Sequence, residues 1–397
     1  MGLAENPPVF SPSPLPARDR SLSPDIARGL LLLFIAIANV PGFCFGQAMN
    51  QDSLPNRAAG AFNAMFVVNR SRPMFAILFG FGIAMMASRM TTRGMDLGAV
   101  RRVLRRRSLW LIVIGVLHSI FLWPGDIIAS YGVTALIALF LVDRDDRVLR
   151  RWFVASIPIM CVGFTVMFYP LMMWSETEAG LTLVETMLTG AVASVFFQLL
   201  SVTTLVYLPP VIIGFWFFRS GWLMHPEEHL PHVRRVFGVT MVATVVLSIP
   251  AVLSAVGVWT VAAAPLLALA VFEILVGIAT GAGYVCGFAL LAARWADRGR
   301  TGLPGVLAAV GERSLTAYLL QSVLFFAVVG RFGLGLGEGL GTLARTVVAL
   351  VVWGVIAVGM AALARWNRRG PFEILIRHLT YRGLTFSGGP GTTKAPA

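Results

Sequence analysis

The chain has 397 residues, of which 57% are hydrophobic and only 13% are charged. This composition excludes a soluble globular domain and predicts an all-α, polytopic integral membrane protein. The 32 lysines and arginines outnumber the 19 acidic residues. Almost all of this excess lies between apolar runs, as in the cytoplasmic loops of membrane proteins. We therefore expect membrane lipids as partners and no nucleic acid, and the sequence leaves a homo-oligomer open.

Apolar runs long enough to cross a bilayer, about 20 residues each, occur ten times along the chain. Their approximate ranges are 28–46, 72–90, 108–123, 127–142, 152–174, 190–219, 236–258, 265–294, 305–329 and 343–364. Pro209 and Pro210 lie inside the long sixth run and should kink or restart its helix, because proline lacks the backbone donor. We predict one membrane domain, 25–382, between disordered cytoplasmic tails at 1–24 and 383–397.

The basic residues predict how the chain is oriented in the membrane. Arginines gather before the first run and after the second, fourth, sixth, eighth and tenth runs. Cytoplasmic loops are enriched in lysine and arginine, so all of these segments should face the cytoplasm. Both termini are then cytoplasmic, and we expect a multi-pass protein of the bacterial cell membrane. His118 and Asp126 fall near the outer face.

Two early runs carry a cation at the inner end and a polar group toward the outer end. Arg28 and Asn39 are eleven residues apart, and so are Arg107 and His118. At 1.5 Å and 100° per residue, the members of each pair lie roughly 16 Å apart on nearly one helix face. Arginine at the inner end of a span is also ordinary, because its charge reaches the interface while its stem stays in lipid. The spacing alone leaves both interpretations open.

His118 is followed eight residues later by Asp126, after a short Trp-Pro-Gly turn. The other four histidines fall on the predicted inner side and the three cysteines have no CxxC spacing, so we expect no metal. Histidine titrates near neutral pH and can deprotonate a hydroxyl group when a carboxylate orients its ring. A hydrated histidine and aspartate in a loop is the alternative interpretation.

Other polar side chains inside the predicted spans need an explanation, because they are costly in lipid. Glu273 lies one turn into its run, and Gln321 lies deeper, where its amide needs a buried partner or water. Glu312 and Arg313 are interpreted as a charge pair at the inner start of the ninth span. The candidate substrate contacts are Arg72, Trp123, Tyr131, Tyr318 and Gln321.

Five segments, in order, resemble the signatures of a known family. They are "ARGLLLLFIAIANV", "FAILFGFGIAMM", "GVLHSIFLWPGDIIASYGVTALI", "GERSLTAYLLQSVL" and "RRGPFEILIRHLTY". From about Arg28 to Tyr381 the chain resembles the YeiB-like bacterial membrane family, a domain-of-unknown-function family. The resemblance implies a relation to transmembrane acyltransferases, which move an acyl group from cytosolic acyl-CoA to a hydroxyl or amine across the membrane. Asn39 departs from the functional histidine of some of these relatives, and asparagine cannot act as a base.

The residues and the resemblance together predict transmembrane acyl transfer. Arg28 and Arg107 would bind the phosphate or pantetheine part of acyl-CoA from inside. His118, oriented by Asp126, would deprotonate the acceptor, a hydroxyl or amine of an envelope glycan or lipid. Asn39 would donate a hydrogen bond to the thioester carbonyl as negative charge develops on its oxygen.

Two other functions compete with acyl transfer. A small-molecule transporter or permease would use Glu273, Gln321 and the Pro209–Pro210 break to form a substrate path without covalent chemistry. A non-catalytic membrane partner is the third hypothesis. Binding and turnover of acyl-CoA would distinguish an enzyme from a transporter.

Overall fold

The computed structural model describes residues 22–174, 182–259 and 263–382. Within these ranges the chain is helical and contains no β-strand, apart from one isolated bridge between Phe45 and Glu338. The predicted all-α fold class is confirmed for this part of the chain. The predicted tails, 1–24 and 383–397, lie outside the described residues except for 22–24, where α1 begins.

The helices follow one another with short connections. The α-helices are α1 (Ser23–Asn39), α2 (Leu54–Phe66), α3 (Ser71–Thr92), α4 (Leu97–Phe121), α5 (Ile128–Ala138), α6 (Asp146–Trp174), α7 (Leu183–Thr204), α8 (Leu208–Arg219), α9 (Leu230–Leu247), α10 (Ile249–Ala255), α11 (Ala263–Arg294), α12 (Gly302–Glu312), α13 (Ser314–Val328), α14 (Thr342–Arg365) and α15 (Pro371–Tyr381). Short 3-10 helices are η2 (Val40–Phe43), η3 (Pro226–His229) and η4 (Ala296–Arg298).

Several helical stretches have the length and composition of membrane spans. In the described part of the chain they are Ser23–Phe43, Leu54–Thr92, Leu183–Leu200, Pro226–Leu247, Pro265–Arg294 and Thr342–Arg365. The shorter helices α5, α8, α12 and α13 are also apolar. Large apolar side chains such as Leu199, Val242 and Val355 are exposed on the outside of the bundle, as expected for a surface that lipid covers. These are the features of a helical membrane protein.

Three predicted spans are each divided into two helices. The break in 190–219 falls at Leu205, whose φ is 51°, and Pro209 and Pro210 lie in the first turn of α8. Proline is tolerated there because the first N–H groups of a helix have no partner within it. The spans 236–258 and 305–329 were predicted as single helices, and this is corrected: they divide at Ser248 and Arg313.

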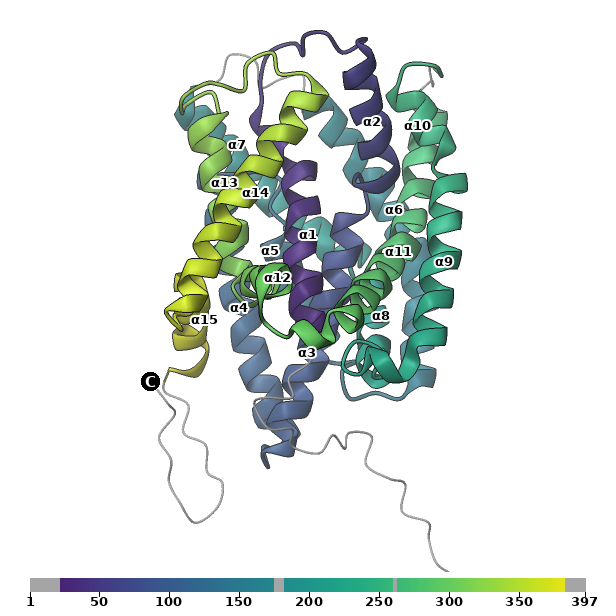
Figure 1. Ribbon diagram of the computed structural model, residues 1–397, viewed down its shortest axis with the longest axis vertical. Helices are drawn as coiled ribbons and strands as arrows, with labels where there is room; N and C mark the ends of the chain where they lie inside the picture. Colours follow the sequence, from purple (N-terminus) through teal and green to yellow (C-terminus); the bar gives the residue numbers. More distant parts are fainter. Residues whose placement is uncertain (1–21, 175–181, 260–262, 383–397) are drawn as a thin grey trace, which may run out of the picture.

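The helices surround α1, which lies near the centre of the bundle in Figure 1, with α9 and α10 on one side and α15 on the other. Glycines allow the closest helix contacts. A Cβ atom on Gly80 of α3 would lie 2.2 Å from the carbonyl oxygen of Val211, and one on Gly214 of α8 would lie 2.1 Å from that of Ile77. The two helices therefore pack backbone to backbone, as is typical of small residues in membrane spans.

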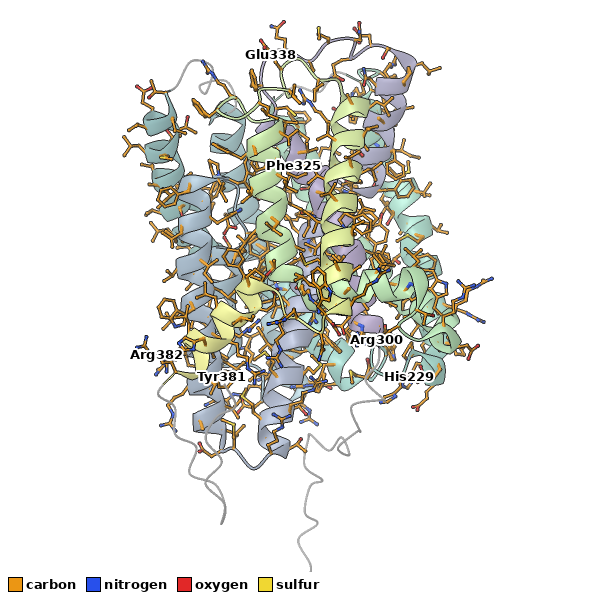
Figure 2. The ribbon with its side chains drawn as sticks, turned by 60° about the vertical axis from the view of Figure 1, so that its left-hand side comes forward. His229, Arg300, Phe325, Glu338, Tyr381 and Arg382 are labelled. Atoms are coloured by element: carbon orange, nitrogen blue, oxygen red, sulfur yellow. The ribbon has the colours of Figure 1, made fainter. Side chains whose placement is uncertain are left out.

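The two ends of the bundle differ in their residues. Figure 2 shows Glu338 at one end, and Tyr381, Arg382, His229 and Arg300 toward the other. We call the end with α15 the inner end and the end with Glu338 the outer end, following the predicted orientation. Tyr284 of α11 donates a 2.8 Å hydrogen bond to the backbone oxygen of Phe66 and so ties α2 to the bundle.

Candidate functional site

A cavity of 780 Å³ lies in the inner half of the bundle. Its walls come from α1, α3, α4, α5, the α12–α13 junction and the segment from the end of α14 through α15. Pockets that bind small molecules typically measure about 300–1,000 Å³. The cavity therefore has the size of a site for a cofactor-sized ligand.

The lining of this cavity is strongly basic. Seven arginines contribute to it: Arg28, Arg89, Arg107, Arg313, Arg368, Arg369 and Arg377. The acidic lining residues are Asp25, Glu312 and Glu373, and each has a partner. Asp25 lies 3.4 Å from Arg28, and Glu312 lies 2.6 Å from Arg300. A cavity lined mainly by one sign of charge attracts ligands of the opposite sign, so this one favours an anion.

Glu373 and Arg313 fix α15 as one wall of the cavity. The Glu373 carboxylate accepts hydrogen bonds from the backbone N–H groups of Leu315 (2.8 Å) and Thr316 (3.1 Å) and from the Thr316 hydroxyl (2.5 Å). These groups belong to the first turn of α13, where a carboxylate is favourable. The Arg313 guanidinium donates to the Arg368 carbonyl oxygen from Nε (3.0 Å) and Nη2 (2.6 Å).

His118 and Asp126 form a buried pair beyond the deep end of the cavity. His118 Nδ1 lies 2.8 Å from Asp126 Oδ1, and both side chains are 1% exposed. The second oxygen of Asp126 accepts the Ala129 N–H at 3.0 Å and holds the carboxylate at the start of α5. Gly115 on α4 makes room, because a Cβ there would lie 2.5 Å from Asp126 Oδ2. The structure therefore brings the two predicted residues together.

The geometry leaves one nitrogen of His118 available for proton transfer. His118 Nε2 is buried and has no hydrogen-bond partner among the described residues. When Nδ1 donates its proton to a carboxylate, Nε2 carries the lone pair of the neutral ring. The pair can accept a proton at Nε2 while Asp126 stabilises the charged ring.

Tyr318 separates the cavity from the histidine. Its side chain lines the cavity, its hydroxyl donates to Asp126 Oδ1 at 3.4 Å, and its ring lies 5.4 Å from the His118 ring. His118 and Asp126 do not line the cavity, whereas the neighbouring Ile127 does. Along α4, the lining residues Arg107 and Leu111 lie on the helix face that continues to His118.

Three other predicted site residues line the cavity or its border. Arg28 and Arg107 both line it, and the Arg28 guanidinium lies against Gly82 of α3. Tyr131 lines the deep end and donates a 2.7 Å hydrogen bond to the backbone oxygen of Arg72. Arg72 itself borders a separate space of only 20 Å³ and not the large cavity.

The remaining predicted residues lie away from the large cavity. Asn39 is the last residue of α1 and is partly buried, and Trp123 stacks on Phe43 with ring centroids 4.8 Å apart. Gln321 is buried and donates a 2.9 Å hydrogen bond to the backbone oxygen of Leu32. The amide of Gln321 thus has the buried partner that its depth in the span requires.

A second buried ion pair was missed from the sequence. Arg70 is fully buried, and its Nη1 lies 2.7 Å from Glu273 Oε2. Arg70 also donates to the carbonyl oxygen of Val68 at 2.8 Å and to the Ser248 hydroxyl. Sequence reasoning placed Arg70 in an outer loop, since no local pattern links it to an acid in α11. A lone glutamate inside an apolar run was the one available signal.

Comparisons with known proteins find one family model and several proteins that this chain resembles. Residues 217–383 match the model of a family described as "Protein of unknown function (DUF418)". The chain is 26% identical to the uncharacterized protein YeiB of Escherichia coli K12, over 95% of this chain and 99% of that protein. It is 22% identical to the uncharacterized protein YxaH of Bacillus subtilis 168, over 90% and 93%. The names of these relatives state no activity.

Proposed function

The chain is a YeiB-like protein, as its motifs predicted, and from this premise we propose that it is a membrane-embedded acyltransferase. Acyl-CoA from the cytosol is the donor, and a hydroxyl or amine of an envelope glycan or lipid at the outer face is the acceptor. One observation carries the proposal. The buried His118–Asp126 pair, 2.8 Å apart, leaves Nε2 without a partner among the described residues, and the His118 ring lies 5.4 Å from the ring of Tyr318, which lines a basic cavity.

The donor would enter the cavity from the inner end. Arg28 and Arg107 bind its phosphate groups, because guanidinium groups form paired, charge-assisted hydrogen bonds with phosphate. Arg107 and His118 lie about 16 Å apart along α4, a length comparable to an extended pantetheine arm. The thioester would then lie near Tyr318, at the deep end of the cavity.

The chemistry proposed is general-base acyl transfer. His118 Nε2 removes the proton of the acceptor, whose oxygen or nitrogen attacks the thioester carbonyl carbon. The tetrahedral intermediate collapses as the C–S bond breaks, and the CoA thiolate takes the proton from the histidine. Tyr318 must turn aside for this contact, and its hydroxyl is better placed than the Asn39 amide to stabilise the oxyanion.

The proposal includes a topology. We infer ten crossings, made by the long apolar helices together with the shorter ones, with both termini in the cytoplasm and the protein in the bacterial cell membrane. The described helices that fall on the ten predicted runs support this count: α1, α3, α4, α5, α6, the pair α7–α8, the pair α9–α10, α11, the pair α12–α13, and α14. The arginine-rich inner end supports the orientation.

Replacing His118 tests the function. We expect His118→Ala or His118→Asn to lower acyl transfer by about 10²–10⁴-fold, the usual contribution of a general base. Cells that express each variant are fed click-tagged acyl precursors, and acylated envelope glycans and lipids are measured by mass spectrometry. His232→Ala, which removes an exposed histidine of α9, is the matched control. Unchanged acylation in the His118 variants at equal expression would remove the base assignment.

A transporter of organic anions is the second candidate. The observation that favours it is the cavity itself, whose arginines belong to the inner end and whose deep end is closed by Tyr318 and Ile127. Such a vestibule suits a carrier that faces one side of the membrane. Purified protein offered click-tagged acyl-CoA distinguishes the two, because a transporter leaves the thioester intact and an acyltransferase releases free CoA.

A further inference from the structure

The segment after α14 contributes two arginines to the cavity, and packing does not explain their presence there. Arg369 and Arg377 line the cavity and are exposed. Their side chains form no ion pair or hydrogen bond with other described residues, in contrast to Arg313, whose guanidinium is held by the Arg368 carbonyl. A free arginine at the cytoplasmic end of a membrane protein is ordinary by itself. Two that line one cavity favour a ligand that carries negative charge.

Arg107 adds a third cation from the neighbouring wall. It lies on α4, against which α15 packs, and it lines the same cavity. Among the described residues no acidic lining residue forms an ion pair with these three arginines: Glu373 is bound to the first turn of α13, and Glu312 lies 2.6 Å from Arg300. Three guanidinium groups around one cavity match a ligand that carries several phosphate groups.

A chain of contacts links the helix that carries Arg377 to the His118–Asp126 pair. Glu373 joins α15 to the first turn of α13, and Tyr318 lies one turn further along α13. Tyr318 in turn contacts Asp126. The helix that carries Arg377 is therefore held in place relative to Tyr318.

We propose that Arg107, Arg369 and Arg377 form a binding site for a polyphosphorylated ligand and that the C-terminal helix is part of it. This rests on the proposed function, in which the ligand is the phosphate end of acyl-CoA. The shared chemistry also fits the headgroup of an anionic lipid. Arg369 and Arg377 are then binding residues that the early helices do not supply, and Glu373 is a positioning residue.

Binding measurements on the full-length protein in neutral detergent test the site. The probes are unacylated CoA, ADP and pantetheine, titrated by calorimetry at low and high ionic strength. We expect CoA and ADP to bind and pantetheine to bind much more weakly, and we expect affinity to fall with salt. Arg369→Gln together with Arg377→Gln should weaken CoA binding at least about tenfold, since hydrogen bonds to charged groups are strong.

The matched control is Arg234→Gln with Arg235→Gln, which removes two exposed arginines of α9 that do not line the cavity. This control should bind CoA like the wild type, and size-exclusion profiles should show that both variants are folded. Equal CoA affinity in the wild type and in the Arg369/Arg377 variant would overturn the proposed site.

A further experiment distinguishes a lipid headgroup from CoA as the ligand. It also distinguishes a failure of this site from a failure of the proposed function. The protein is placed in nanodiscs of phosphatidylcholine with or without phosphatidylglycerol. If phosphatidylglycerol displaces ADP from the wild type while CoA does not, the phosphate-binding site is supported and its ligand is a lipid headgroup. Acyl-CoA is then excluded as the ligand of this site, and the proposed donor is contradicted. If no phosphate-bearing probe binds, the site is overturned, whereas the role of His118 still depends on the acylation measurement.

Discussion

The protein contains two buried ionisable pairs that differ in what surrounds them. His118–Asp126 and Arg70–Glu273 are each almost fully buried, with contacts of 2.8 Å and 2.7 Å. Arginine keeps its proton in proteins, so the Arg70 pair cannot exchange one. Histidine can, and the His118 pair borders a cavity across Tyr318. Burial alone therefore does not mark a chemical site, whereas a titratable nitrogen next to a ligand-sized space does.

The largest effect on stability should come from breaking the Arg70–Glu273 pair, which lies away from the cavity. Arg70→Ala leaves Glu273 buried without its cation, and we expect the free energy of unfolding to fall by about 3–5 kcal/mol. Chemical unfolding in detergent measures this. Arg70→Met with Glu273→Leu removes both charges and should lose much less. An Arg70→Ala protein as stable as the wild type would show that the ion pair does not hold α3 and α11 together.

A smaller effect is expected where the backbone approaches the histidine pair. A Cβ at Gly115 would lie 2.2 Å from the Ala129 nitrogen and 2.5 Å from Asp126 Oδ2. Gly115→Ala should cost about 1–3 kcal/mol of stability through overpacking and should lower acyl transfer by displacing Asp126, with CoA affinity unchanged. Gly354→Ala on α14 meets no atom within 4 Å and is the control. Full transfer activity in Gly115→Ala would argue against a required position for Asp126.

The smallest effect on stability is expected from a change to Tyr318, which lies between the cavity and His118. Tyr318→Phe keeps the ring and removes the 3.4 Å hydrogen bond to Asp126. The free energy of unfolding should fall by about 0.5–1.5 kcal/mol, while the rate of acyl transfer falls more than CoA affinity does. Rates and affinities measured on the same preparation separate the two. Transfer at the wild-type rate would exclude the hydroxyl as an oxyanion donor.

The parts of the site that local sequence determines could be predicted. His118 and Asp126 are eight residues apart across a tight turn, so a helical hairpin brings them together. Helical periodicity likewise places Arg107 and Leu111 on the face that leads to His118. Burial of Gln321 implied a partner, but nothing in the sequence identified the Leu32 carbonyl.

Other parts could not be predicted, because they depend on contacts between distant segments. Arg70 and Glu273 meet only when α3 packs on α11. Glu373 reaches α13 only after α15 folds back onto the bundle. Hydropathy also misses helix breaks: the residues around Ser248 are apolar enough for one continuous span, and the charges of Glu312 and Arg313 were interpreted as the start of a span and not as a break within it.

The most direct test compares the two buried pairs in one measurement. Envelope acylation is measured in cells that express His118→Asn or Arg70→Ala and is normalised to the amount of folded protein. Asparagine can still donate to Asp126 but cannot accept the proton. We predict that His118→Asn abolishes transfer by a folded protein, and that Arg70→Ala lowers the folded amount with transfer per folded molecule retained. Transfer retained by His118→Asn, or lost per folded molecule in Arg70→Ala, would contradict the account.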